Sequence, residues 1–135
     1  MSLIKLFFNY WKSIINGFLI LFLSFAAPST FSEIPPFEFT YPDKIVHIIM
    51  YGALTMALLL DFKKNNNLNS KKLNFVLFCI LFPIIYGGVI EIVQSAYFPP
   101  RTGDWFDWIA DIIGVMMALM MMNAWEKIII RRKKS

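Results

Sequence analysis

Four long apolar runs, separated by short polar segments, make up most of the chain. A helix needs about 17–25 apolar residues to cross a bilayer, and each run reaches this length when a few flanking residues are included. We therefore predict an all-α polytopic membrane protein, with four transmembrane helices in a small bundle that forms a single domain over residues 1–135. The predicted helices cover approximately residues 8–27, 44–61, 73–96 and 104–126.

The first run, from Ser13 to Ala27, is the shortest, with 15 uncharged residues before Pro28. Its basic start and the Ser-Phe-Ala sequence at 24–26 also resemble a signal peptide with its cleavage site. We prefer a retained membrane helix, because Pro28 so close behind that site would hinder cleavage. A cleaved first segment stays the alternative.

Three residue types in the third run carry structural expectations. Pro83 lies in its middle and removes a backbone hydrogen bond, which predicts a kink. The pair Gly87-Gly88 lets a neighbouring helix approach closely. The single cysteine, Cys79, has no disulfide partner and no second thiolate for a metal site, so we interpret it as a small buried or lipid-facing residue.

The composition strengthens the membrane interpretation. Hydrophobic residues make up 58% of the chain, whereas soluble domains are about 45–50% apolar. The net charge of +4 is compatible with nucleic-acid binding, but the basic residues stand at the ends of apolar runs. That placement indicates membrane topology, with the lipid bilayer as partner and no nucleic acid.

The charges also predict an orientation. Four spans place the N-terminus, the turn at 61–72 and the C-terminus on one side, which collects eleven basic and two acidic residues. The opposite side has two basic and seven acidic residues. Because basic loops stay in the cytoplasm, we predict that both termini are cytoplasmic, in a multi-pass protein of the cytoplasmic membrane.

Polar side chains gather at the outer ends of the last three predicted helices. With about 1.5 Å of rise per residue, His47, Glu91 and Asp111 reach similar depths just below the outer surface. An ionisable residue inside a bilayer costs about 2.5–3.5 kcal/mol, so such residues are functional candidates. We predict a shared acidic pocket, open to the outer side and formed by Asp43, His47, Tyr51, Glu91, Gln94, Arg101, Asp104, Asp107 and Asp111.

Simpler structural roles compete with this interpretation. Asp43 and Asp104 follow loop residues and can act as helix caps. Arg101 can serve only as the counter-ion that makes Asp104 or Asp107 tolerable. Lone His47 lacks the nitrogen and sulfur partners of a usual zinc site, so we predict no metal and no cofactor, although a hard cation held by carboxylates stays open. The tryptophans at 105 and 108 fit the aromatic belt of a membrane protein.

The same residues resemble the VanZ-like family of bacterial membrane proteins over about residues 40–118. The resemblance rests on Asp43-Lys44-x-x-His47-x-x-x-Tyr51, Glu91-x-x-Gln94, Arg101, Asp104, Asp107 and Ala110-Asp111-x-x-Gly114. The family is named after a protein associated with low-level resistance to teicoplanin, a glycopeptide that binds cell-wall precursors. The resemblance implies an envelope role at the outer leaflet of the bacterial inner membrane and gives no reaction. The family usually has Asn where this chain has Asp111, which adds a potential negative charge.

Three functions follow in order of preference. The first is binding, without catalysis, of a lipid-linked cell-wall or surface-polymer precursor, or of an amphiphilic drug. The second is an enzyme acting on lipid headgroups, with His47 or Glu91 as general base, Arg101 on a phosphate and Ser95 as the nearest nucleophile. The third is an ion- or proton-coupled carrier. The sequence assigns no protein partner.

Overall fold

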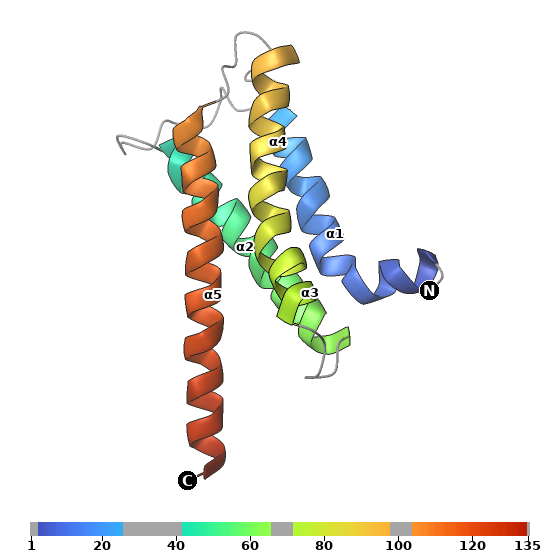
Figure 1. The fold of residues 1–135 in the computed structure, drawn as a ribbon, viewed down its shortest axis with the longest axis vertical. Helices are drawn as coiled ribbons and strands as arrows, with labels where there is room; N and C mark the ends of the chain where they lie inside the picture. Colours follow the sequence, from blue (N-terminus) through green and yellow to red (C-terminus); the bar gives the residue numbers. More distant parts are fainter. Residues whose placement is uncertain (1–2, 26–41, 66–71, 98–103, 135) are drawn as a thin grey trace.

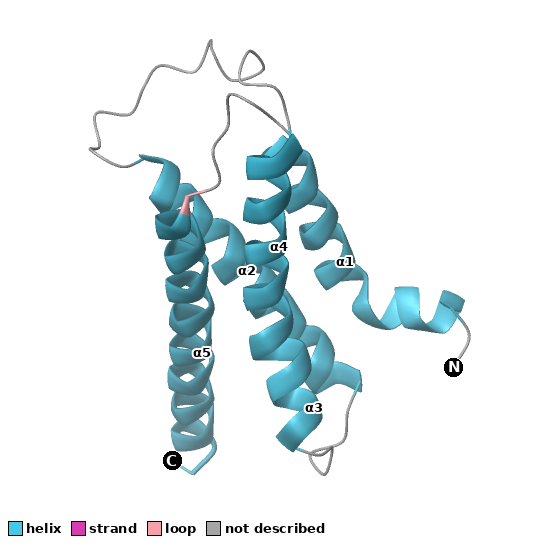
Figure 2. Cartoon of the chain, turned by 45° about the horizontal axis from the view of Figure 1, so that its top comes forward, coloured by secondary structure: helices cyan, strands magenta, loops and turns pink. Residues whose placement is uncertain are grey.

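Helices form almost all of the described part of the chain. The computed structural model describes residues 3–25, 42–65, 72–97 and 104–134, and within these ranges only Asp104 lies outside a helix (Figure 2). The helices are α1 (Leu3–Phe25), α2 (Pro42–Asn65), α3 (Lys72–Val76), a π-helix η2 (Leu77–Leu81), α4 (Phe82–Tyr97) and α5 (Trp105–Lys134). The all-α prediction is confirmed for these residues.

Among the described residues, three stretches are long and apolar enough to cross a membrane. They are Asp43–Asn65, Asn74–Tyr97 and Trp105–Arg132. Helix α1 is not among them, and its backbone leaves helical geometry at Tyr10, with φ −121° and ψ 22°. The part after the kink, residues 11–25, is about 22 Å long at 1.5 Å per residue, whereas the apolar core of a bilayer is about 30 Å thick.

Successive long helices run in opposite directions (Figure 1). The helix ends that the sequence places on one side of the membrane therefore lie at one end of the bundle. The last turn of α1, the first turn of α2, the last turn of α4 and the first turn of α5 lie together there. The segment of α1 before its kink turns away from the bundle near the opposite end. We call the first end the site end and the other the lysine end, since Lys63 of α2 pairs with Glu126 of α5 there.

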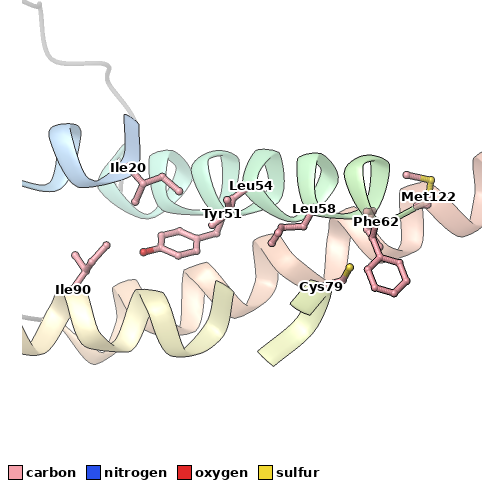
Figure 3. Close-up of a cluster of buried hydrophobic side chains, with 9 residues drawn as sticks. Ile20, Tyr51, Leu54, Leu58, Phe62, Cys79, Ile90 and Met122 are labelled. Atoms are coloured by element: carbon pink, nitrogen blue, oxygen red, sulfur yellow. The ribbon is translucent and has the colours of Figure 1, made fainter. Parts of the chain in front are cut away.

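Helix α2 is the centre of the packing, because α5, α1 and α4 all contact it. Its inward face supplies most of a buried cluster to which the other helices contribute single side chains (Figure 3). The cluster consists of Ile20, Tyr51, Leu54, Leu58, Leu59, Phe62, Cys79, Ile90 and Met122. Cys79 is fully buried, in agreement with one of the two environments expected for it. Many large apolar side chains on the outside of the bundle stay exposed, as a lipid-facing surface requires.

Pro83 follows a π-helical segment within the third predicted helix. Its ring has no N–H and clashes with the carbonyl four residues earlier in a regular helix, which here is that of Cys79. The chain widens into the π-helix η2 directly before it, and the N–H of Phe82 bonds to the carbonyl of Leu77. A π-bulge of this kind absorbs the mismatch. At the place where the kink was predicted, the structure has a widened π-helical turn between α3 and α4.

Two glycines allow α2 and α5 to touch backbone to backbone. A Cβ atom on Gly114 would meet the carbonyl oxygen of Ile48, and it would lie 3.0 Å from the backbone N of Gly52. A Cβ atom on Gly52 would lie 3.4 Å from the carbonyl oxygen of Gly114. Small residues allow such close helix crossings inside membranes.

The helices extend beyond the predicted ranges toward the lysine end, where α1 begins at Leu3 instead of near residue 8. Helix α2 continues to Asn65 instead of ending near residue 61, and α5 continues to Lys134 instead of ending near 126. Asp61 explains the extension of α2: only 1% of it is exposed, and its Oδ2 accepts bonds from the N–H (3.0 Å) and hydroxyl (2.8 Å) of Ser13. Asn65, one turn further, donates to the carbonyl of Asn9 at 2.6 Å. The polar turn is thus partly helix, and it fastens α1 to α2.

Candidate functional site

Three helices meet at the site end through the side chains of His47 (α2), Glu91 (α4) and Asp111 (α5). One ligand-type atom from each lies within 4.8 Å of the other two. The ring Nδ1 of His47 lies 2.8 Å from Oδ1 of Asp111, at hydrogen-bonding distance. We call these three residues the acidic cluster. They are the three side chains that helix rise places at one depth.

Two carboxylate oxygens of the acidic cluster have no partner among the described residues. Oε1 of Glu91 and Oδ2 of Asp111 are buried and accept no hydrogen bond there. Glu91 is 8% exposed and Asp111 is 0% exposed. Buried carboxylate oxygens are costly when unpaired, because they lose water without gaining another donor or a cation.

The neighbours of the acidic cluster fix its geometry. The backbone N–H of Asp104 donates to Oε2 of Glu91 at 3.0 Å, which orients that carboxylate. The ring of Tyr51 stacks on His47 with 6.3 Å between centroids and 6° between planes. Gly87 leaves the space that Asp111 fills, since a Cβ atom there would meet Oδ2 of Asp111 and lie 3.2 Å from Tyr51. The expectation of close packing at Gly87 is confirmed.

Lys44 forms a second charged group beside the acidic cluster. Its ammonium lies 2.8 Å from Oδ1 of Asp107 and 3.0 Å from Oδ2 of Asp104. Lys44 belongs to the family motif but was not among the predicted site residues. The signal was its spacing, since Lys44, His47 and Tyr51 share one face of α2.

Asp104 has the capping role that the sequence allowed. Its Oδ1 accepts the N–H of Phe106 at 2.9 Å, and its carbonyl accepts the N–H of Asp107 at 2.9 Å. The Phe106 N–H, and after it the Lys44 ammonium, hold the pKa of the Asp104 carboxyl below its ordinary value. Asp104 therefore starts α5 and joins both charged groups at once.

Asp43 is not a helix cap in the sense expected, because α2 begins one residue earlier, at Pro42. It lies in the first turn of α2, where the helix dipole favours a carboxylate. Its side chain is exposed, and it forms a second set of nearby ligand-type atoms with His47 and Asp107.

Gln94 bonds to a different helix from the other described site residues. The side-chain amide of Gln94 donates to the carbonyl of Ser24 at 2.7 Å, so it ties α4 to α1. Tyr86 makes a similar bond to the carbonyl of Gly17 at 2.8 Å. Arg101 lies outside the described residues.

A cavity of about 400 Å³ opens between α4 and α5 beside the acidic cluster. Its lining combines apolar surface with two carboxylates and one hydroxyl, from Gly88, Glu91, Ile92, Ser95, Ala96, Asp104, Trp105 and Trp108. Trp108 donates its ring N–H to the carbonyl of Ile84 at 2.9 Å, and its ring faces Gly88. It is therefore a wall of this cavity and a link between two helices, beyond the membrane-belt role expected for it. Trp105 is 73% exposed.

Comparison with known proteins identifies a family. The model of the VanZ/LLP1 family matches residues 1–126 of the chain. Neither curated proteins nor solved structures give a match. The three apolar helices and the family match together indicate a multi-pass membrane protein. The chain belongs to the VanZ/LLP1 family, as the motifs around the acidic cluster suggested.

Proposed function

We propose that the protein crosses the bacterial cytoplasmic membrane four times, with both termini in the cytoplasm and the site end facing outward. The alternating helices and the basic residues of the lysine end support this orientation. The part of α1 after Tyr10 makes the fourth span, with the preceding amphipathic turns lying in the inner membrane interface. A span shorter than the bilayer core is accommodated by local thinning of the bilayer and by snorkelling of flanking side chains such as Lys12.

The function we propose is binding of a lipid-linked envelope precursor, or an amphiphilic glycopeptide, at the outer leaflet. The observation that carries it is the cavity between α4 and α5. Its volume of about 400 Å³ falls in the range of about 300–1,000 Å³ typical of ligand pockets. The apolar side chains Ile92, Trp105 and Trp108 suit a lipid or acyl chain, whereas Glu91 and Asp104 suit a polar headgroup.

The charged side chains of the cavity limit which headgroups fit it. Glu91 and Asp104 present acceptors, and the nearby Lys44 is already held by Asp104 and Asp107. Hydroxyl, amide and ammonium groups of a sugar or peptide therefore fit the wall directly, because they donate hydrogen bonds. A bare phosphate would be repelled there unless a cation accompanies it.

An enzyme acting on lipid headgroups is the second candidate, favoured by one observation. The hydrogen bond between His47 and Asp111 is the arrangement that orients a histidine for general base catalysis. Ser95 lines the same cavity as Glu91. Purified protein that releases phosphate or headgroup from lipid-phosphate substrates, with or without Mg²⁺ or Ca²⁺, would raise this candidate above binding.

The role is tested by growth of a deletion strain under teicoplanin and other envelope stress. The strain is complemented with wild type, Glu91→Gln, Trp108→Phe and the lipid-facing control Met120→Leu, with membrane levels of each measured. We expect the two cavity variants to be made normally and to complement poorly, whereas the control complements fully. Full complementation by both cavity variants would show that the cavity has no part in the phenotype.

A further inference from the structure

The acidic cluster has the donor set and the burial of a metal site. A ring nitrogen of His47 and one oxygen each from Glu91 and Asp111 lie within 4.8 Å of one another. Three protein ligands with room for a further ligand are typical of catalytic and exchangeable metal sites. We propose that these residues bind one divalent metal ion of the Zn²⁺ or Mn²⁺ type, held between α2, α4 and α5.

The two unpartnered oxygens carry this proposal. Oε1 of Glu91 and Oδ2 of Asp111 accept no hydrogen bond from any described residue, although both side chains are more than nine-tenths buried. An ion with two positive charges neutralises the two carboxylates and gives both oxygens a partner. One ion thereby removes the largest unfavourable feature of the site.

The remaining atoms of these ligands are already oriented, as in established metal sites. Oε2 of Glu91 accepts the backbone N–H of Asp104 at 3.0 Å, and Oδ1 of Asp111 lies 2.8 Å from His47. Gly87 keeps the space around Oδ2 of Asp111 free of a Cβ atom. Because Glu91 also lines the cavity between α4 and α5, an ion can reach the cluster from there.

The second set of ligand-type atoms, from Asp43, His47 and Asp107, fits an ion less well. Oδ1 of Asp107 lies 2.8 Å from the Lys44 ammonium, whose charge repels a cation. Asp43 is exposed, so water already solvates its carboxylate. Asp43→Asn is therefore a matched control: it removes one carboxylate close to His47 without touching the proposed ligands.

The donor chemistry selects the class of metal. Imidazole favours Zn²⁺ and other borderline ions, whereas carboxylates alone favour Mg²⁺, Ca²⁺ and Mn²⁺. One imidazole with two carboxylates falls between these groups, which points to Zn²⁺ or Mn²⁺. The lone histidine argued against a metal from sequence only because zinc sites commonly use several nitrogen or sulfur ligands.

The inference deepens the proposed function without needing it for its test. If the ligand is a lipid-linked precursor, the ion supplies the positive charge that its phosphate requires beside Glu91. This consequence rests on the proposed function, whereas the metal site itself is measured without any lipid. Failure of lipid binding with a bound metal would remove only the proposed function.

The test uses full-length protein carrying no histidine tag, in nanodiscs, first treated with chelator and then dialysed against Mn²⁺ or Zn²⁺. Bound metal is counted by mass spectrometry, and its affinity is measured by titration. We expect about one ion per chain in wild type and in Asp43→Asn. We expect affinity about tenfold or more weaker in His47→Gln, Glu91→Gln and Asp111→Asn. Binding of less than a tenth of an ion per wild-type chain would overturn the proposal, as would loss of binding in Asp43→Asn alone.

Melting temperature separates loss of metal from loss of fold. An ion that binds only the folded protein raises its melting temperature, in wild type but not in a ligand variant. In chelator, Glu91→Gln is expected to melt at or above the wild-type temperature, because it removes a buried charge and keeps an oxygen for the Asp104 N–H. With metal added, the order is expected to reverse. A variant that melts equally far below wild type in both conditions would contradict a metal role for Glu91.

Discussion

His47 and Asp111 are 64 residues apart in the sequence, yet Nδ1 of the one lies 2.8 Å from Oδ1 of the other. The contact joins α2 to α5 at the site end, below Lys44 with its own pair of carboxylates. It uses one oxygen of Asp111 and leaves the other facing Gly87 without a partner among the described residues. Asp111 therefore both connects two helices and holds a buried oxygen without a partner among the described residues.

These two roles of Asp111 separate by substitution. Asp111→Asn keeps an oxygen that accepts a hydrogen bond from His47, and the family resemblance makes Asn the usual residue here. Asp111→Leu leaves the ring of His47 unpaired, which costs about 1–3 kcal/mol. We expect Leu to lower the melting temperature in chelator well below that of Asn. Equal melting of the two variants would show that the contact with His47 does not stabilise the fold.

The crossing of α2 and α5 predicts a strong effect of one methyl group. In Gly114→Ala the new Cβ would meet the backbone of Ile48 and Gly52, which cannot rotate away. Overpacking of this kind costs about 1–3 kcal/mol. Gly17→Ala is the matched control, since the nearest atom to its Cβ would be the hydroxyl of Tyr86 at 3.9 Å. Thermal unfolding in nanodiscs should show a loss for Gly114→Ala and no loss for Gly17→Ala.

Substitutions of two neighbouring glycines on α4 distinguish the acidic cluster from the cavity wall. A Cβ on Gly87 would displace Oδ2 of Asp111, whereas a Cβ on Gly88 would lie 3.2 Å from the ring nitrogen of Trp108. We expect Gly87→Ala to weaken metal binding about tenfold or more and Gly88→Ala to leave it unchanged. Metal titration of both proteins checks this, and an equal loss in both would point to a general packing defect.

Hydrogen bonds at the lysine end hold α1 against α2. The carboxylate of Asp61 accepts two hydrogen bonds from Ser13, and Lys12 lies 4.0 Å from its other oxygen. Asp61→Leu leaves the Ser13 hydroxyl and N–H without this acceptor, at a cost of about 1–3 kcal/mol. We expect spin labels on Ile15 and Met56 to show a longer and broader distance in Asp61→Leu than in wild type. An unchanged distance would mean that packing alone holds α1.

Much of this arrangement follows from sequence, for identifiable reasons. Helix rise alone places His47, Glu91 and Asp111 at one depth, because membrane helices run nearly parallel and side chains three or four residues apart share a face. The choice of partners does not follow, since it depends on helix rotation. Gln94 has the spacing of a site residue but bonds to Ser24 of α1. Lys44, which follows the predicted site residue Asp43, is the counter-ion of Asp104 and Asp107.

Helix lengths were harder to predict from the sequence, for a different reason. A charged residue such as Asp61 reads as the end of a membrane helix, and only the tertiary bond to Ser13 shows that it is buried. Likewise, the kink at Tyr10 could not be predicted, because no proline or glycine lies at this position. Both features lie where α1 contacts α2, whereas the extension of α5 to Lys134 is a separate difference.

The topology predicts which cysteines react from outside. In a Cys79→Ala background, a cysteine placed at Ser32 should react with a membrane-impermeant maleimide in intact cells with the outer envelope permeabilised. A cysteine at Asn67 should react only after the cytoplasmic membrane is opened, because the lysine end faces inward. The reverse pattern would invert the orientation and place the acidic cluster on the cytoplasmic side.

Ligand binding in the cavity between α4 and α5 is measured most directly with a photoreactive lipid-linked envelope precursor and the purified protein in nanodiscs. We expect saturable crosslinking that maps to α4 and α5 around Glu91 and Trp108 and is undiminished in Met120→Leu. For Glu91→Gln we expect a loss of about tenfold or more in apparent affinity, since each lost charge-assisted hydrogen bond contributes about 1.5–3 kcal/mol. Crosslinking that is equal in wild type and Glu91→Gln, or that maps to the lipid-facing side of α5, would contradict binding in this cavity.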